Sequence, residues 1–338
     1  MDKRTFIKTL GLGMASLPVS SMALDARPSV LPATYPPLIA RGDTVGVITP
    51  SSPLVDDKGY AIASANFDAL GLRIKWGAHV GKKYGYLAGT DEERIADLEG
   101  MFSDSEVKAI VCLRGGSGAA RLLDKLDYQL IARNPKIFLG YSDITAFHQA
   151  IHTQTGLITF HGAVANSPWT PMVLHQFEQL FMEGKLPTYA AGEEPIRTLT
   201  SGVASGKLFG GNLTVLTGIV GSKYFPDFKD SILFVEDIGE EPYRIDRMFS
   251  QLALSGALQS ISGFIFGRCS DCEAKNPANS LTLEQILDDY IKPLGIPAYQ
   301  GALIGHMDEQ FILPIGATVR MDADAGSITV VEDSCRTT

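Results

Sequence analysis

Residues 140–143 read Gly-Tyr-Ser-Asp and contain a serine whose position suits a nucleophile. The preceding β-rich run, residues 136–140, ends there, and the pattern of residues 144–154 predicts a helix that begins at once. A serine at such a strand-to-helix corner presents its hydroxyl at the sheet edge, and the following N–H groups point toward a bound anion. Ser142 is therefore a candidate nucleophile, although serine is also a common helix N-cap and Ile144 stands where the usual elbow consensus has glycine.

A base and an acid for this serine are available at the ends of other predicted strands. Of the six histidines, His161 and His306 follow strand-like runs, whereas the other four occupy positions more typical of structural residues. Glu236 and Asp237 directly follow the apolar run 231–235. A buried carboxylate that holds an imidazole in one tautomer completes a Ser–His–acid relay. The residues alone leave open which histidine and which carboxylate would act.

A glycine-rich loop, residues 114–118 (RGGSG), follows the apolar run 109–113. Three glycines within four residues allow positive φ angles and a close approach of the backbone to a ligand. The loop lacks the Lys and Ser/Thr of a Walker motif and the G-x-G-x-x-G spacing of a dinucleotide loop. Bare N–H groups on such a loop suit an oxyanion hole.

The elements around these residues alternate between strand and helix in the first half of the chain. Strands are predicted at 43–50, 73–76, 109–113 and 136–140, and helices at 57–70, 90–102, 119–125 and 144–154. This alternation predicts a parallel sheet with helices on both faces, whose functional sites lie outside the carboxyl ends of the strands.

The pattern changes after residue 170, where we expect a connection over residues 171–205. It begins with an amphipathic helix at 171–183 and continues as an irregular stretch rich in Gly and Pro. Beyond it, short strands and helices alternate and end in an antiparallel pair, at 231–235, 244–255, 263–266, 282–291, 318–321 and 327–331. The expected domains are therefore 38–170 and 206–332.

Composition and charge exclude several classes of function. The 338 residues carry a formal net charge of -9 and no basic run, which argues against a nucleic-acid partner. No apolar stretch beyond the N-terminus is long enough to span a bilayer, so no membrane contact is expected of the mature form. Cys269 and Cys272 have zinc or redox spacing, but no second pair or nearby histidine completes a metal site. Whether these two cysteines are bonded is left open.

The first 26 residues are typical of an export signal. They combine a basic start, a small and apolar run at 9–17 and a small-x-small cleavage site at 21–23. Residues 3–8 (KRTFIK) also resemble the twin-arginine motif, with Lys in place of the first Arg. A short N-terminal helix is the alternative interpretation. We expect a periplasmic protein, with the cytoplasm as the alternative.

Six short runs, in this order, resemble the LD-carboxypeptidase family, which includes muramoyltetrapeptide carboxypeptidases and microcin C immunity peptidases. The runs are 88–91 (AGTD), 114–116 (RGG), 140–143 (GYSD), 210–213 (GGNL), 236–247 (an ED pair, then PY and DR) and 305–306 (GH). Each run alone is unspecific, but their order is distinctive, and the resemblance spans residues 38–320.

The resemblance implies an α/β fold of two domains with the active site between them. The N-terminal domain would be a parallel α/β sheet with a nucleophile elbow, and the C-terminal domain would be of mixed α+β type. The residues that match the family's motifs are Ser142 as nucleophile, His306 as base, Glu236 as the residue that orients the base, and the N–H groups of Gly116 and Asp143 as oxyanion hole. His161 then becomes a structural residue near the site. Ser117 stands where the family often has Tyr, which puts the shape of the substrate pocket in doubt.

The activity implied is that of a serine carboxypeptidase that hydrolyses an L-to-D peptide bond. Its substrate would be murein tetrapeptide, which loses its terminal D-Ala during cell-wall turnover and recycling. Arg114 and Arg244 are the candidates for binding the free carboxylate of the substrate. No metal or cofactor is implied, and the family suggests a homodimer. The alternatives are an immunity-type peptidase that cleaves a peptide–nucleotide conjugate and, in another class, an exported ligand-binding protein.

Overall fold

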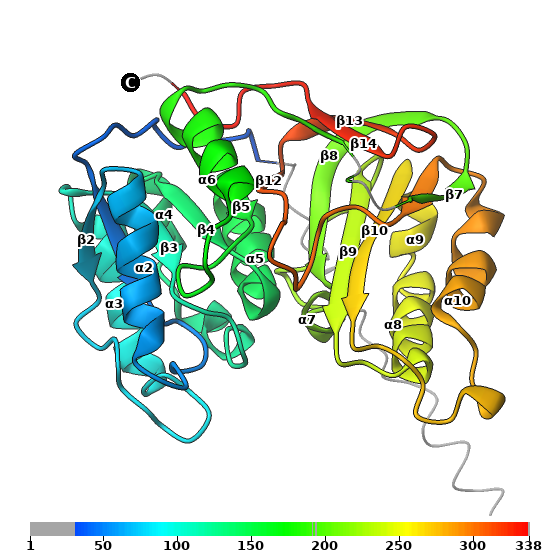
Figure 1. The fold of residues 1–338 in the computed structure, drawn as a ribbon, viewed down its shortest axis with the longest axis horizontal. Helices are drawn as coiled ribbons and strands as arrows, with labels where there is room; N and C mark the ends of the chain where they lie inside the picture. Colours follow the sequence, from blue (N-terminus) through cyan, green and yellow to red (C-terminus); the bar gives the residue numbers. More distant parts are fainter. Residues whose placement is uncertain (1–30, 191, 193–194, 337–338) are drawn as a thin grey trace, which may run out of the picture. The chain divides into compact units, whose positions relative to one another are not determined.

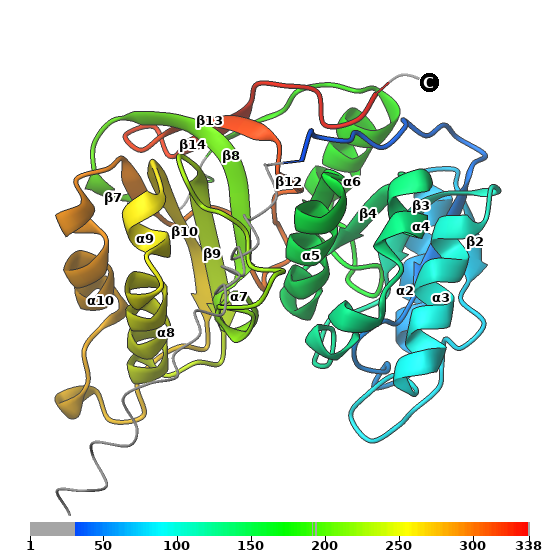
Figure 2. The ribbon, with the colours of Figure 1, turned by 180° about the vertical axis from the view of Figure 1, so that it is seen from behind.

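The computed structural model describes residues 31–190, 192 and 195–336, so the expected export signal lies outside the described residues. Two sheets organise this part of the chain (Figures 1 and 2). The first has six strands in the order β12-β5-β4-β3-β1-β2, and the second has eight in the order β6-β14-β13-β8-β9-β10-β11-β7. Within the described residues, no helix combines the length and apolarity that crossing a membrane requires.

Five strands of the first sheet run parallel and the sixth is antiparallel. The parallel strands are β1 (Thr44–Ile48), β2 (Arg73–Trp76), β3 (Val107–Cys112), β4 (Ile137–Gly140) and β5 (Thr159–His161). The antiparallel strand β12 (Leu313–Ile315) pairs with β5 from far along the chain. The predicted parallel sheet is confirmed, and its strands direct their carboxyl ends toward one edge.

Helices cover both faces of this sheet. One apolar core contains side chains of α2 (Lys58–Ala69) and α6 (Pro171–Phe177), and the other contains side chains of α3 (Asp91–Ser103), α4 (Tyr128–Arg133) and α5 (Thr145–Thr155). Helices α2 and α6 lie in front of the sheet in Figure 1, and helices α3, α4 and α5 lie in front of it in Figure 2. Helix α3 begins at a capping box in which Thr90 accepts from the N–H of Glu93 and the Glu93 carboxylate accepts from the N–H of Thr90. The predicted helix at 119–125 is a 3₁₀ helix, Ala120–Lys125.

The second sheet is mixed. Its central strands β8 (Val203–Asn212), β9 (Ile232–Ile238), β10 (Gly263–Ser270) and β11 (Ala298–Gln300) are parallel, and β6 (Thr188–Ala190), β7 (Arg197–Thr200), β13 (Thr318–Asp322) and β14 (Ser327–Val330) are antiparallel to their neighbours. The predicted antiparallel pair near the C-terminal end is β13 with β14. Helices α7 (Leu213–Gly218), α8 (Pro242–Leu254), α9 (Ala257–Ser260) and α10 (Leu283–Tyr290) contribute side chains to its apolar core.

The segment at 171–205 contributes elements to both sheets, and one strand from the expected second domain pairs with the first sheet. Helix α6, which continues as a π-helical turn at Glu178–Met182, packs on the first sheet, whereas β6 and β7 are outer strands of the second. Strand β12, expected in the second domain, belongs to the first sheet. These strands have only three or four residues, too few for an alternating pattern, so their sheet is decided by tertiary pairing.

Candidate active site

The serine of the GYSD run lies on a tight corner between β4 and α5. Ser142 has a φ of +63°, in the left-handed region that residues with a Cβ rarely adopt. A Cβ added to Gly140 would lie 3.1 Å from Cys112 Cβ, and one added to Gly115 would lie 2.9 Å from Ser142 Cβ. The two glycines therefore let the serine turn outward while the glycine-rich loop packs against it.

Ser142, His306 and Glu236 form a continuous chain of polar contacts. Ser142 Oγ lies 3.1 Å from His306 Nε2, and His306 Nδ1 lies 2.9 Å from Glu236 Oε2. With the proton on Nδ1, the imidazole donates to the carboxylate and its Nε2 accepts from the serine hydroxyl. Of the two histidines and two carboxylates left open by the residues alone, only this pair is linked to Ser142 among the described residues.

Glu236 is wholly buried at the carboxyl end of β9. Burial raises the pKa of its carboxyl, and the hydrogen bond and charge interaction with His306 oppose that rise. Gly305, at a φ of +132°, precedes the histidine, and a Cβ there would lie 3.2 Å from Glu236 Oε2. Glycine at this position lets the backbone pass close enough for the imidazole to reach the carboxylate.

The end of β8 positions β9, the strand of Glu236, against helix α5, which follows the serine. Asn212 pairs with Glu236 in the parallel ladder, and its N–H donates to Thr145 Oγ1 at 2.9 Å. A Cβ on Gly211 would lie 2.4 Å from the same Thr145 Oγ1, and the Gln149 amide donates to the carbonyl of Gly210 at 2.7 Å. The GGN run thus joins the second sheet to helix α5.

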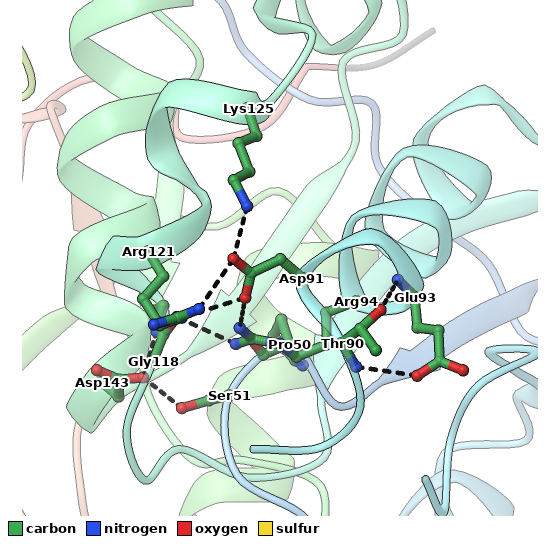
Figure 3. A network of polar contacts seen from close by, with 11 residues as sticks. Pro50, Ser51, Thr90, Asp91, Glu93, Arg94, Gly118, Arg121, Lys125 and Asp143 are labelled. Atoms are coloured by element: carbon green, nitrogen blue, oxygen red, sulfur yellow. Dashed lines mark hydrogen bonds and ion pairs between the residues drawn. The ribbon is translucent and has the colours of Figure 1, made fainter. Parts of the chain in front are cut away.

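Asp143 connects three loops at the carboxyl edge of the first sheet (Figure 3). Its Oδ2 accepts a hydrogen bond from Ser51 Oγ, after β1, and one from Ala119 N at 2.8 Å, after the glycine-rich loop. Burial raises the pKa of the Asp143 carboxyl, and these two donors oppose the rise. Asp143 therefore fixes the loops after β1 and after the glycine-rich segment relative to Ser142.

A buried arginine strengthens the same edge (Figure 3). Arg94, whose side chain is wholly buried, donates to the carbonyls of Pro50 at 2.8 Å and Gly118 at 3.0 Å, and to Asp91 Oδ1 at 2.7 Å. Asp91 also accepts from Lys125 and Arg121, and these bonds hold its pKa well below the usual range of a carboxyl. The loops on both sides of Ser142 are thus tied to helix α3.

Of the other residues predicted for the site, Gly116 and Arg114 lie in the glycine-rich loop, and Arg244 lies on helix α8. Gly116, at a φ of +122°, packs on Ser52, where an added Cβ would lie 2.3 Å from Oγ. Arg114 belongs to the loop that contacts Ser142 and donates to the carbonyl of Pro53 at 2.8 Å. Arg244 is more than half exposed on α8 and interacts with Glu240 and Tyr243.

His161 is buried next to the triad but is not part of it. Its ring centroid lies 6.1 Å from that of Tyr141 and 5.1 Å from that of Phe234, and burial lowers its pKa well below the usual value. Tyr141 in turn lies 4.8 Å from the His306 ring, centroid to centroid. Sequence reasoning did not single out Tyr141, Ser51 or Arg94, although Tyr141 lies within the GYSD run.

Cys269 and Cys272 form a disulfide at the end of β10. Among the residues that the structure describes, no group of three or more His, Cys, Asp or Glu side chains is placed to hold a metal ion. The CxxC spacing in this chain therefore corresponds to a covalent bond.

Two family models and two relatives that match this chain all carry names that refer to carboxypeptidases. The LD-carboxypeptidase N-terminal domain matches residues 45–162, and the LD-carboxypeptidase C-terminal domain matches residues 205–321. The chain is 43% identical over 302 residues to a probable murein peptide carboxypeptidase of Bacillus subtilis, with 88% of this chain and 94% of the relative covered. It is 33% identical over 313 residues to the murein tetrapeptide carboxypeptidase of Pseudomonas aeruginosa, covering 89% and 99%.

A solved structure extends the likeness to three dimensions. The microcin C7 self-immunity protein MccF superposes with a TM-score of 0.80 at 26% identity, and the match covers 90% of this chain and 100% of that structure. The two-domain α/β fold, the enzyme class and the expected family are thereby confirmed. This protein belongs to the LD-carboxypeptidase family of serine peptidases.

Proposed function

We propose that this enzyme removes the terminal D-Ala from murein tetrapeptide, with Ser142 as nucleophile, His306 as base and Glu236 as the residue that orients the base. The observation that carries the proposal is the unbroken contact chain from Ser142 Oγ through both ring nitrogens of His306 to a buried carboxylate. The names of the two relatives, which refer to murein peptides, support the choice of substrate.

The proposed reaction proceeds through an acyl-enzyme. Ser142 Oγ attacks the carbonyl carbon of the L-to-D bond while His306 Nε2 takes the hydroxyl proton. The C–N bond breaks as that proton passes to the departing D-Ala nitrogen. A water molecule then gives a proton to His306 Nε2 as its oxygen bonds to the acyl carbon. The bond between that carbon and Ser142 Oγ breaks, His306 returns the proton to Oγ, and the tripeptide leaves.

Two further roles belong to the proposal. The N–H groups of Gly116 and Asp143 would stabilise the oxyanion, because one lies in the loop packed against Ser142 and the other directly follows it. Arg114 is preferred over Arg244 for the substrate carboxylate, since its loop contacts the serine. Arg114→Gln should raise KM for tetrapeptide, whereas Arg244→Gln should leave it unchanged.

The test of function is incubation with murein tri-, tetra- and pentapeptides followed by mass analysis. We expect the tetrapeptide to lose one alanine and the tripeptide and pentapeptide to stay intact. Ser142→Ala should lower the rate of tetrapeptide cleavage by about a thousandfold or more. A Ser142→Ala protein that still turns over tetrapeptide would rule out this serine as nucleophile. An exported binding protein would instead retain its ligand response in that variant.

An immunity-type activity is the second candidate, favoured by the structural likeness to MccF. One MccF structure holds aspartyl sulfamoyl adenosine, which makes this compound a suitable probe. Release of aspartate from it, with no cleavage of tetrapeptide, would favour the immunity-type function over the murein function.

We also propose that the enzyme is exported to the periplasm and forms a homodimer. The leader-like residues 1–26 support export, and a disulfide is typical of oxidising compartments. Cell fractionation tests the location, with the cytoplasm as the contrary result, and light scattering of the purified protein tests the dimer.

A further inference from the structure

Ser270 lies between the strand that carries Glu236 and the loop that carries His306. Its carbonyl oxygen accepts a hydrogen bond from the N–H of Gly239, just beyond the acid strand, at 2.8 Å. Its hydroxyl donates to the carbonyl oxygen of His306 at 3.0 Å. One residue thus contacts the backbone on both sides of the acid–base pair.

The Cys269–Cys272 disulfide closes a covalent ring that contains Ser270 and Asp271. Cys269 pairs with Asp237 in the parallel ladder, so one end of the ring is held by the sheet. Asp271 has a φ of +55°, a left-handed turn conformation that Asp adopts more readily than most residues with a side chain. The ring restrains the turn that presents the Ser270 hydroxyl to the histidine loop.

We propose that this disulfide positions the imidazole of His306 through Ser270, so that turnover depends on the oxidised state of Cys269 and Cys272. The inference rests on the proposed role of His306 as base. Without the disulfide, the turn gains backbone freedom and the hydroxyl of Ser270 loses its fixed position. The carbonyl of His306 is then released, and the ring moves relative to Ser142, whose reaction tolerates misplacement of about 1 Å poorly.

The contacts of this loop favour a positioning role over a redox-catalytic one. Cys272 is buried, with 8% of its surface exposed, and Cys269 is partly buried against the core of the second sheet. Ser270 touches the backbone of His306 and not its ring, so it acts through the base.

Reduction by dithiothreitol tests the proposal directly. Dithiothreitol supplies two electrons and two protons, closes to its cyclic disulfide and leaves Cys269 and Cys272 as thiols, which alkylation and mass analysis verify. We expect kcat for tetrapeptide to fall about fivefold or more, with KM unchanged within about twofold, because the loss concerns the base and not substrate contacts. Labelling of Ser142 by a fluorophosphonate, which needs no peptide, should slow by a similar factor.

Variants separate this route from a general loss of structure. Cys269→Ser combined with Cys272→Ser should show the reduced rate without dithiothreitol. Ser270→Ala should lower kcat and no longer respond to dithiothreitol, and Ser270→Thr, which keeps the hydroxyl, should recover most of the rate. Ser262→Ala is the matched control, since Ser262 Oγ donates to the carbonyl of Ser231 at the other end of β10, and its kcat should match the wild type.

Two outcomes would overturn the proposal. One is an unchanged rate after verified reduction, and the other is an equal response to dithiothreitol in wild type and Ser270→Ala. If the oxidised wild type neither cleaves tetrapeptide nor reacts with the fluorophosphonate, the proposed function itself fails. Normal turnover that is insensitive to reduction refutes only the role of the disulfide.

Discussion

Ser142 occupies a left-handed backbone conformation although it has a side chain. Such a conformation costs about 1 to 3 kcal/mol for a residue other than glycine and persists where surrounding contacts impose it. Here Gly115 packs so closely on the serine that an added Cβ would lie 2.9 Å from Ser142 Cβ, and His306 Nε2 contacts the hydroxyl at 3.1 Å. The position of the proposed nucleophile is therefore maintained at a cost in stability.

Two variants that both lack the hydroxyl measure this cost. The free energy of unfolding of Ser142→Gly should be about 1 kcal/mol higher than that of Ser142→Ala. Glycine relieves the backbone strain of the folded state, but its greater freedom in the unfolded chain offsets part of this gain in stability. Urea titration of both proteins gives the difference. An alanine variant as stable as the glycine variant would contradict a strained elbow.

The buried carboxylate of Glu236 gives a prediction on pH. The pKa of Glu236 is higher in the folded protein than in the unfolded chain. At a pH above the unfolded pKa, the unfolded chain therefore binds fewer protons at this residue than the folded protein does. The contribution of Glu236 to the free energy of unfolding consequently falls as the pH rises. Glu236→Gln should therefore gain stability relative to wild type on going from pH 4 to pH 7, while kcat falls by about four orders of magnitude. Denaturant unfolding at both pH values checks the sign.

The same comparison in a His306→Gln background is the control. This background removes the charge interaction with His306 that opposes the rise in the pKa of Glu236, so the effect should keep its sign and grow. A relative stability that stays constant or falls with pH would show that the carboxyl of Glu236 is not shifted upward.

At the scale of elements, helix α3 secures the loops around the serine through Arg94. Arg94→Met should lower the free energy of unfolding by about 3 to 5 kcal/mol. The change leaves the buried carbonyl of Pro50 and the partly buried carbonyl of Gly118 without their donor, and it removes one partner of Asp91. Activity should fall as well, since the glycine-rich loop loses a support.

Arg121→Met is the matched control for this change. Arg121 also donates to Asp91, but its side chain is half exposed, so its loss should cost less than about 1 kcal/mol. Thermal unfolding of both variants gives the comparison. Similar destabilisation by the two changes would mean that burial of Arg94 does not matter.

The elements explain which part of the site could be read from the sequence. Ser142, Glu236 and His306 were predicted because each follows an apolar strand-like run within an ordered set of motifs. Arg94 was missed because it resembles any charge on an amphipathic helix, and its burial depends on loops near residues 50 and 118. Ser51 directly follows the predicted strand 43–50 and carries no local signal of its role, since its partner Asp143 is 92 residues away. Long-range contacts of this kind leave no local pattern.

The cysteines show the same limit. The CxxC spacing fits zinc, redox chemistry or a disulfide equally well, and only the approach of the two side chains at the end of β10 distinguishes them. Likewise, three residues of β12 carry too little pattern to indicate that they complete the first sheet. The fold class was predictable, but the exchange of elements between the sheets was not.

At the scale of the whole molecule, the two sheets meet where Gly211 passes Thr145. Gly211→Ala would place a Cβ 2.4 Å from Thr145 Oγ1 at a φ of +136°, so one sheet must shift relative to the other. We expect kcat/KM to fall about a hundredfold and the free energy of unfolding to fall by about 3 kcal/mol. Steady-state kinetics and urea unfolding measure both.

Gly218→Ala is the corresponding control at the end of α7. A Cβ there meets no atom within 4 Å, so stability should change by less than about 1 kcal/mol, and activity should be retained. If Gly211→Ala behaves like this control, the close approach at the joint does not set the geometry of the triad.

The separation of Ser142 and His306 along the chain also affects the order in which the protein acquires its properties during synthesis. The two residues are 164 positions apart, and strand β12, which completes the sheet of the serine, comes later still. In the proposed mechanism, a growing chain therefore carries Ser142 as an ordinary alcohol until residues 306 and 313–315 have been made and have folded against the sheet of the serine. Before that point, the chain lacks the base that would activate this hydroxyl.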